Sequence, residues 1–325
     1  MTRSSCSRSY PSKIVSSAQQ ILSTFIGGLD TIAVEGNIET GKIEGFLGIL
    51  PFLDSVTESI KEFCQSLREE QRSIKKEIKE ENGRKVEYMY IDGIKVHETD
   101  PDKQPQPPVV EPKPYNAKTA KPPKGAIVLF DGTEKTLKNW TSGNGKPTKW
   151  KLVEGALESV RGGGYLQSKQ EFGSCKLHVE FATPKEVKGS GQGRGNSGVF
   201  LMGQYEIQVL DSYKNITYPD GQCGALYGRA KPLVNASRGP GEWQTYDVTF
   251  HRPIFNEDGE VTRKAKFHVI HNGHVIHDNL ELSGGTGWRG PHSISEYKKH
   301  GDKGPLKMQD HGNPVSYRNI WLRKL

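Results

Sequence analysis

From Ala126 to the C-terminus, almost every segment is a short run rich in β-branched and aromatic residues that ends at Gly, Asn, Asp or Pro. Such runs are typical of β-strands joined by tight turns. No helical repeat of apolar residues occurs in this part of the chain. The pattern therefore predicts a mainly β fold, a β-sandwich of jelly-roll type in which two sheets of short antiparallel strands pack face to face.

The first 82 residues follow a different pattern. From about residue 44 to 81, apolar residues recur at steps of three and four between charged residues, with one polar interruption near Glu70 and Gln71. This spacing predicts an amphipathic α-helix within an N-terminal extension, residues 1–82, and fits the seam of a coiled coil or of a helical hairpin. Because the polar face carries both charges, we expect a homo-oligomer formed through this helix, or packing on the main domain, rather than membrane binding. The apolar positions are Ile49, Leu53, Val56, Ile60, Phe63, Leu67, Ile74 and Ile78.

Residues 83–124 are predicted to connect this extension to a β-sandwich domain, residues 125–325. Val86 to Asp100 is predicted to form a short hairpin with its turn at Asp92-Gly93. Asp102 to Gly125 contains seven prolines. That content predicts an extended segment, either a stiff linker or a strap.

Composition limits the classes of partner. The 45 Lys and Arg against 38 Asp and Glu give a formal net charge of +7, but the two signs are interspersed. We find no nucleic-acid-binding motif and expect no nucleic-acid partner. No apolar run reaches the roughly 18 residues of a membrane helix, so we expect no transmembrane segment. The N-terminus does not form a clear signal peptide, and the localisation stays open.

Neither the cysteines nor the histidines predict a metal site, and we expect no cofactor. The four cysteines lack metal-ligand spacing. Cys175 and Cys223 either pair or stay free thiols. The stretch HVIHNGHVIH places four histidines on both sides of a predicted Asn272-Gly273 turn, which favours a solvated hairpin over a metal site.

The stretch GNSGVFLMGQYEIQVLDSY, beginning at Gly195, is predicted to form two strands joined by a Gly203-Gln204 turn of type II′. Alternation along the two strands then divides their side chains between two faces. The predicted core face holds Phe200, Met202, Tyr205 and Ile207. The opposite face holds Val199, Leu201, Glu206 and Gln208. This second face is either a solvated surface or the floor of a site that grips the hydroxyls and apolar patches of a sugar.

A second polar stretch lies near the C-terminus, in GPLKMQDHGNPVSYRNIWLRKL. Gln309 and His311 come at the end of one predicted strand. A Gly-Asn-Pro turn then leads to a last strand that carries Arg318. Polar side chains on adjoining strands indicate a convergent cluster, which favours a site over a plain surface.

These two stretches, together with YPDGQCGALYG, PLVNASRGPGEWQTYDVTFHRP, FDGTEKTLKNW and WKLVEGALE, resemble successive blocks of the 3-keto-disaccharide hydrolase domain family. The resemblance covers roughly Lys85 to Leu325, and residues 1–82 have no counterpart in it. It implies a concanavalin A-like β-sandwich and an activity on glycosides oxidised at C3. A 3-keto group acidifies the C2 proton, so one base can remove that proton while the C1 substituent leaves, and water adds afterwards.

The resemblance and the polar clusters together assign provisional roles. Glu206 and His311 are the catalytic candidates, one as base and the other as acid or positioning group. Asp211 is a further candidate, although its place at a turn favours capping of the backbone or pairing with Arg229 or Arg318. The candidates for binding the sugar are Asn196, Gln208, Tyr227, Gln309 and Arg318.

Two other functions stay open on the sequence alone. One is a non-catalytic carbohydrate-binding module on the same sandwich, since a fold does not fix a function. The other is an interaction protein whose helix organises an assembly and whose sandwich is a passive scaffold. The polar residues at 206, 208, 309 and 311 favour a site over a scaffold.

Overall fold

The computed structural model describes residues 74–81, 83–91, 94–95, 106–115, 120–287 and 296–325. Contacts between α-carbons divide the chain into two units, Met1–Arg72 and Ser73–Leu325. All described residues belong to the second unit. Most of the predicted N-terminal helix therefore lies outside the described residues.

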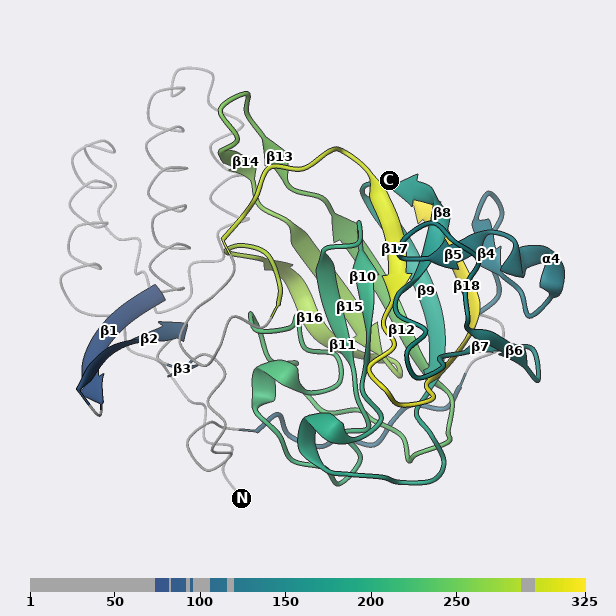
Figure 1. Ribbon diagram of the computed structural model, residues 1–325, viewed down its shortest axis with the longest axis horizontal. Coiled ribbons are helices and arrows are strands. Elements are labelled where there is room, and N and C mark those ends of the chain that lie inside the picture. Colours follow the sequence, from purple (N-terminus) through teal and green to yellow (C-terminus); the bar gives the residue numbers. More distant parts are fainter. Residues whose placement is uncertain (1–73, 82, 92–93, 96–105, 116–119, 288–295) are drawn as a thin grey trace, which may run out of the picture. The chain divides into compact units, whose positions relative to one another are not determined.

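Two antiparallel sheets overlie each other in Figure 1 and form a β-sandwich. The first has five strands in the order β11-β10-β17-β8-β5, and the second has eight, in the order β16-β15-β12-β9-β18-β7-β6 with β4 paired to β18. The five-stranded sheet consists of β5 (Trp140–Ser142), β8 (Leu166–Phe172), β10 (Ser197–Leu201), β11 (Tyr205–Val209) and β17 (Gly304–Met308). The eight-stranded sheet consists of β4 (Ile127–Phe130), β6 (Lys151–Val153), β7 (Ala156–Glu158), β9 (Cys175–Ala182), β12 (Gln244–His251), β15 (Lys266–His271), β16 (His274–Glu281) and β18 (Ser316–Lys324).

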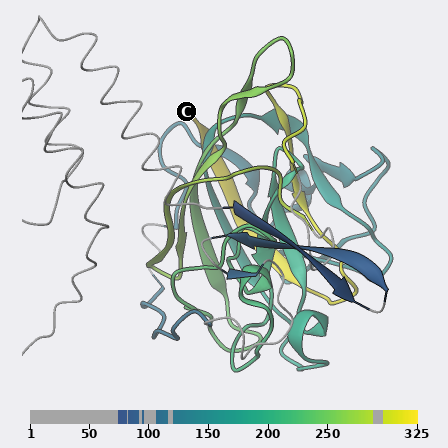
Figure 2. The same cartoon turned by 90° about the vertical axis from the view of Figure 1, so that its left-hand side faces the viewer.

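Short elements connect or flank these sheets. The ribbon of β13 (Ile254–Phe255) and β14 (Val261–Arg263) extends from one end of the sandwich in both views (Figure 1, Figure 2). The only helical elements among the described residues are α4 (Glu134–Leu137) and the 3-10 turns η2 (Gly191–Gly193) and η3 (Pro219–Gly221). The prediction of a mainly β, antiparallel fold is confirmed. The assignment to the concanavalin A-like jelly rolls stays a prediction.

The core lies between the two sheets because each strand turns every second side chain inward. In β12, buried and half-buried residues alternate along the whole strand. The inward side chains Tyr246 and Phe250 are fully buried, as is Phe181 of the neighbouring β9. From the five-stranded sheet, Ile207 and Met308 join the same apolar cluster. Each such side chain contributes about 1.5–3 kcal/mol to the stability of the sandwich.

The β10–β11 hairpin has a different register from the predicted one. Leu201 pairs with Tyr205, so three residues lie in the turn and not two. Met202 and Gly203 both adopt left-handed backbone conformations, with φ of 52° and 67°. Glycine therefore takes the second left-handed position of the turn, whereas the type II′ prediction had placed it first.

The shifted register exchanges residues between the two faces of β10. Val199 and Leu201 pack in the core, and Phe200 shares the outer face with Glu206 and Gln208. The predicted positions of Phe200, Val199 and Leu201 were wrong. The positions of Glu206 and Gln208 outside the core were right, because alternation within β11 does not depend on the turn.

The proline-rich segment is a strap over its described residues. Val110 donates a backbone hydrogen bond to the Asn235 carbonyl at 3.0 Å, and Lys113 donates one to the Asn272 carbonyl at 3.1 Å. At the start of the segment, Gln106 Nε2 donates to the Thr217 carbonyl at 3.1 Å. These bonds decide between the two predicted alternatives in favour of a strap over residues 106–115.

The helix prediction was wrong over its last eight residues. Ile74–Glu81 forms β1, which pairs with β2 (Arg84–Ile91) in a three-stranded sheet completed by β3 (Ile94–Lys95). Glu81 pairs with Arg84, so two residues connect the strands, and the second, Gly83, has a φ of 74°. An Asn-Gly pair is a strong hairpin signal, and here it outweighed the spacing of the isoleucines.

The structure also resolves the cysteine alternatives and one histidine prediction. Cys175 and Cys223 are free and buried. The predicted Asn272-Gly273 turn joins β15 to β16, but the hairpin is not solvated throughout. His271 is fully buried and contacts the Gln244 side chain at 3.0 Å, because alternation turns it inward. Among the described residues, no helix is long and apolar enough to cross a membrane, and no group of three or more His, Cys, Asp or Glu is arranged to hold a metal ion.

Candidate functional site

The outer face of the five-stranded sheet carries a buried polar cluster. Glu206 and Gln208 alternate along β11 with the core residues Tyr205 and Ile207, so they point away from the core. Both are nevertheless almost fully buried, at 6% and 2% exposure. Burial on the outer face means that other parts of the chain cover them. An ordinary solvated surface does not bury two long polar side chains in this way.

The Glu206 carboxyl group occupies the space that a side chain at position 198 would fill. Gly198 lies opposite Gln208 on the neighbouring strand. A β-carbon at this position would stand 2.5 Å from Glu206 Oε1 and 2.8 Å from the Phe200 ring. The carboxyl group therefore rests on bare backbone, and any side chain at position 198 would displace it.

The backbone of Glu206 is fixed on both sides. Its N–H donates to Thr286 Oγ1 at 2.8 Å, and its carbonyl accepts from the Tyr227 N–H at 3.2 Å. Burial raises the pKa of the carboxyl group to about 8. The group can therefore exchange a proton near neutral pH, as an acid or base catalyst must.

Two tyrosines lie beside this carboxyl group. Tyr227 is opposite Glu206 where residues 224–227 extend the sheet past β11, as the bridge between Ile207 and Leu226 shows. The hydroxyls of Tyr227 and Tyr218 lie 2.7 Å apart. Burial raises the pKa of both, and the negative charges of Glu206 and Asp220 raise them further. Both phenols consequently stay protonated and can donate hydrogen bonds.

Three amide side chains form a connected group at the other end of the cluster. Gln192 Oε1 accepts from Gln208 Nε2 at 3.0 Å and from Asn196 Nδ2 at 3.4 Å. Asn196 also donates to the Gln192 carbonyl at 2.7 Å. Gln208 Oε1 is buried and has no hydrogen-bond partner among the described residues.

Gln309 follows the last residue of β17 and lies beside Gly198, which in turn lies opposite Gln208. Its N–H donates to the Gly198 carbonyl at 3.1 Å, and its Nε2 donates to the Tyr165 hydroxyl at 3.4 Å. The Tyr165 ring meets the Phe200 ring edge-on, with centroids 5.5 Å apart. These residues thus add an amide and two aromatic rings beside Gly198, groups that suit a sugar ring with its hydroxyls.

His311 and Asp211 have different surroundings from those predicted. His311 is exposed in the turn after β17, and among the described residues no hydrogen bond or ion pair joins its side chain to the cluster. Asp211 is buried, and its carboxylate accepts from Arg194 Nε at 2.7 Å and from the Tyr213 N–H at 3.2 Å. Asp211 therefore caps backbone, as its place at a turn had indicated, but its arginine partner is Arg194 and not Arg229 or Arg318.

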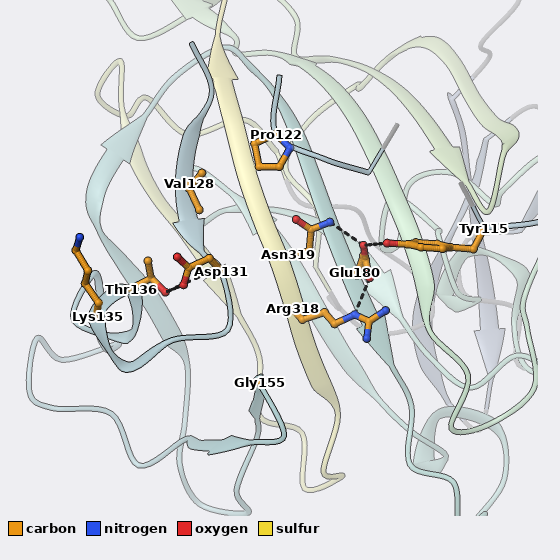
Figure 3. A pocket seen from close by; sticks show the side chains of 10 residues that line it. All are labelled: Tyr115, Pro122, Val128, Asp131, Lys135, Thr136, Gly155, Glu180, Arg318 and Asn319. Carbon is orange, nitrogen blue, oxygen red and sulfur yellow. Dashed lines mark hydrogen bonds and ion pairs between the residues drawn. The ribbon is translucent and has the colours of Figure 1, made fainter. Parts of the chain in front are cut away.

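Arg318 lies on the other side of the sandwich. It pairs in register with Glu180 of β9 on the outer face of the eight-stranded sheet, and the core separates it from Glu206. Figure 3 shows Arg318, Asn319 and Tyr115 converging on the Glu180 carboxylate, at 2.7 Å in each case. The structure therefore does not bring Arg318 to Gln309, although the two are close in sequence.

The Glu180 cluster borders an open pocket of about 500 Å³. Burial opposes the charge on Glu180, but hydrogen bonds from His178, Asn319, Arg318 and Tyr115 outweigh it and lower its pKa to about 2. Burial likewise opposes the charge on His178, and the hydrogen bonds with Asp247 and Glu180 raise its pKa to about 9. Because each Glu180 oxygen already accepts hydrogen bonds, this carboxylate holds the sheet and the strap together and has little capacity for a ligand.

Comparison with known proteins now adds to this geometry. Residues 125–323 match the family described as the 3-keto-alpha-glucoside-1,2-lyase-like domain. The chain belongs to this family. The resemblance predicted from the sequence blocks is thereby confirmed, and the polar cluster around Glu206 lies wholly within the family domain.

Two relatives of the family domain are similar over most of their length. A 3-keto-disaccharide hydrolase from Bacteroides thetaiotaomicron is 25% identical over 244 residues, 62% of this chain and 79% of the relative. A crystal structure of a proposed glycosyl hydrolase from Parabacteroides distasonis ATCC 8503 is 41% identical, with a TM-score of 0.60, and the match covers 68% of this chain and 93% of that chain.

Several residues of the cluster were not predicted from the sequence. Gln192 lies in the 3-10 turn η2 and Tyr218 directly precedes η3, where no periodicity marks a buried side chain. Phe200 was assigned to the wrong face with its strand. The sequence signal that could have indicated the cluster is the density of Gly, Asn and Gln between residues 189 and 198, because buried amides need partners and close backbone approach needs glycine.

Proposed function

We propose that the chain is a carbohydrate-active enzyme that cleaves 3-keto-glycosides or 3-keto-disaccharides, with Glu206 as the base that removes the C2 proton. The observation that carries the proposal is the Glu206 carboxyl group, buried over Gly198 with a pKa raised to about 8. Family membership and the hydrolase names of the relatives support the substrate class.

The proposed reaction begins when ionised Glu206 takes the proton from C2. The electron pair of the C2–H bond forms a double bond between C1 and C2 as the bond from C1 to the leaving oxygen breaks. The leaving oxygen takes a proton, and water then adds across the double bond to give the free 3-keto sugar. Negative charge on the C3 oxygen is stabilised by a hydrogen-bond donor, a role that suits the Tyr218–Tyr227 pair.

Ordinary glycosidases use two carboxyl groups on either side of the scissile bond. Asp211, the other carboxylate among the catalytic candidates, is occupied by Arg194 and by backbone. The surroundings of Asp211 therefore favour elimination with one base over displacement with two carboxyl groups. In the proposal, His311, which is exposed in the turn after β17, protonates the leaving group.

One observation also suits the second function, a non-catalytic carbohydrate-binding module. Near neutral pH, a carboxyl group with a pKa of about 8 is largely protonated, and a protonated carboxyl can bind a sugar hydroxyl without transferring a proton. Turnover separates the two functions, because a binding module leaves the substrate intact.

The test incubates the full chain with 3-keto-trehalose or a 3-keto-glucoside in D2O and measures product release together with deuterium at C2 of the product. The proposal expects release with deuterium at C2, and loss of both in Glu206→Gln. Glu171→Gln is the matched control, because Glu171 is an exposed carboxylate on β8 of the same sheet. Release without deuterium would overturn the elimination route, and binding without release would favour the binding module.

A further inference from the structure

The amide group of Gln192 has only one orientation that fits its surroundings. One end of the amide lies 2.8 Å from the Gly221 carbonyl and 3.1 Å from Thr217 Oγ1. A backbone carbonyl can only accept a hydrogen bond, so the nitrogen of Gln192 must be at this end. The oxygen of Gln192 therefore faces Gln208 and Asn196.

This orientation fixes the amide of Gln208 in turn. Its terminal atom nearest to Gln192 lies 3.0 Å from Gln192 Oε1, and two oxygens at that distance would repel each other. The nitrogen of Gln208 consequently faces Gln192. Asn196 is held in the same way, since its nitrogen donates to the Gln192 carbonyl at 2.7 Å. The oxygen of Gln208 is left at the end of the amide that points away from Gln192.

That oxygen has no partner in a place where water has little access. Gln208 is 2% exposed, and its Oε1 accepts no hydrogen bond from any residue that the structure describes. Buried polar atoms are nearly always paired, so an unpaired one needs an explanation, and at a candidate site a ligand that pairs with it supplies one. Gln208 lies next to Gly198 in the sheet, in the row beside that of Glu206, so its oxygen belongs to the same face as the carboxyl group.

We infer that Gln192 positions Gln208 so that Gln208 presents its carbonyl oxygen to the site, and that the bound sugar must donate a hydroxyl hydrogen to Gln208 Oε1. This inference rests on the proposed function and adds a specificity-determining contact to it. Gln208 contacts the substrate, whereas Gln192 is a positioning residue that acts through it. A deoxy or deoxyfluoro sugar at that hydroxyl leaves Oε1 unpaired, since fluorine cannot donate.

The strap supports the same arrangement from the other side. The Thr217 carbonyl accepts from Gln106 Nε2 at 3.1 Å, and Gln106 Oε1 accepts from Gln222 Nε2 at 2.6 Å. The loop that anchors Gln192 is thus held by residues on both of its sides. A change at Gln192 is therefore expected to release the Gln208 amide without moving the loop.

The experiment measures kcat/KM for the parent 3-keto-glucoside and for its monodeoxy and monodeoxyfluoro analogues, modified in turn at each free hydroxyl that the chemistry does not require. For the wild type we expect one position at which both analogues lose about 10- to 100-fold. In Gln208→Leu that loss shrinks to within about threefold, and in Gln192→Leu it shrinks partly, because the amide can then turn either end toward the sugar. Gln167→Leu, on β8 of the same sheet, keeps the wild-type discrimination.

The ratio between parent and analogue separates recognition from folding, because a merely structural role lowers both rates together. Gln208→Met preserves side-chain length and replaces Gln208→Leu if the latter fails to fold. Discrimination that is unchanged at every position in the Gln208 variants would overturn the inference while leaving the proposed function intact. If the wild type does not turn over the parent, the proposed function fails, and the same analogues are compared by calorimetric binding. Absence of sugar binding as well would overturn both.

Discussion

The Glu206 carboxyl group stands directly over Gly198, with Oε1 2.5 Å from where a β-carbon of residue 198 would lie. Gly198→Ala must therefore push the carboxyl group aside or distort β10. We expect a loss of about 1–3 kcal/mol in unfolding free energy and a loss of activity beyond what the unfolded fraction explains. Denaturant unfolding and kcat/KM on the folded fraction measure the two effects. Gly301→Ala is the control, because a β-carbon there meets nothing closer than 3.8 Å; equal activity in both variants would contradict this account of Gly198.

The pH dependence of kcat/KM tests the role of Glu206. If its ionised form takes the C2 proton, activity rises with pH and levels off above about 8, where the buried carboxyl group has lost its proton. Glu206→Gln should abolish this limb together with the activity. A rate that falls through the same pH range would assign Glu206 the acid role instead.

Stability should change in the opposite direction. The pKa of Glu206 is raised from its ordinary value of 4.5 to about 8. Between these two pH values the folded protein keeps a proton on Glu206 that the unfolded chain has released. Unfolding free energy is therefore lost as pH rises through this window, by up to about 1.4 kcal/mol per pH unit. Glu206→Gln lacks this loss, so its advantage over wild type should grow from pH 5 to pH 8. Urea unfolding at several pH values measures it, and an advantage independent of pH would contradict the buried ionisation.

A substitution of Arg318 tests whether this residue stabilises the fold or binds the sugar. Its Nε donates to the buried Glu180 at 2.7 Å, and its guanidinium carbon lies 3.9 Å from the Trp243 ring centroid. Arg318→Met should lower unfolding free energy by about 1–3 kcal/mol while the folded enzyme keeps its kcat/KM, because the core separates the two outer faces. Arg323→Met, at the exposed end of β18, is the matched control. A specific rise in KM in Arg318→Met would restore the sugar-binding role that the sequence indicated.

The exposed His311 can be tested through the leaving group. If it protonates the departing oxygen, His311→Ala should lose about 100-fold with an alkyl or sugar leaving group. It should lose little with a nitrophenyl leaving group, which departs without a proton. Equal losses on both substrates would remove His311 from the proposed mechanism.

The sequence was sufficient for the type of fold and for part of the cluster. Alternation within one strand places Glu206 and Gln208 outside the core whatever the turn, and alternation is a local property. The register between β10 and β11 depended on two left-handed residues, one of which is a methionine, and composition does not reveal that conformation. Phe200 was therefore misplaced with its strand.

Arg318 shows a different limit. It follows Gln309 by nine residues in sequence, yet the chain crosses from one sheet to the other between them. Nearness in sequence says nothing about which sheet a strand joins. The role of Gln192 could not be predicted either. The orientation of its amide depends on a hydrogen bond to the Gly221 carbonyl, and only the folded chain brings these two groups together.

The strap has one more consequence, for whatever precedes it in the chain. Gln106 contacts Thr217 and Gln222, so the polypeptide enters the sandwich beside the loop that anchors Gln192. A module fused directly ahead of Gln106 is therefore expected to lie near the polar cluster around Glu206, where direct fusion keeps its effective concentration high. Fusions or truncations near Gln106 are expected to alter access to the candidate site. Additions after Leu325 begin elsewhere, at the end of β18, where the Leu325 N–H donates to the Ser174 carbonyl.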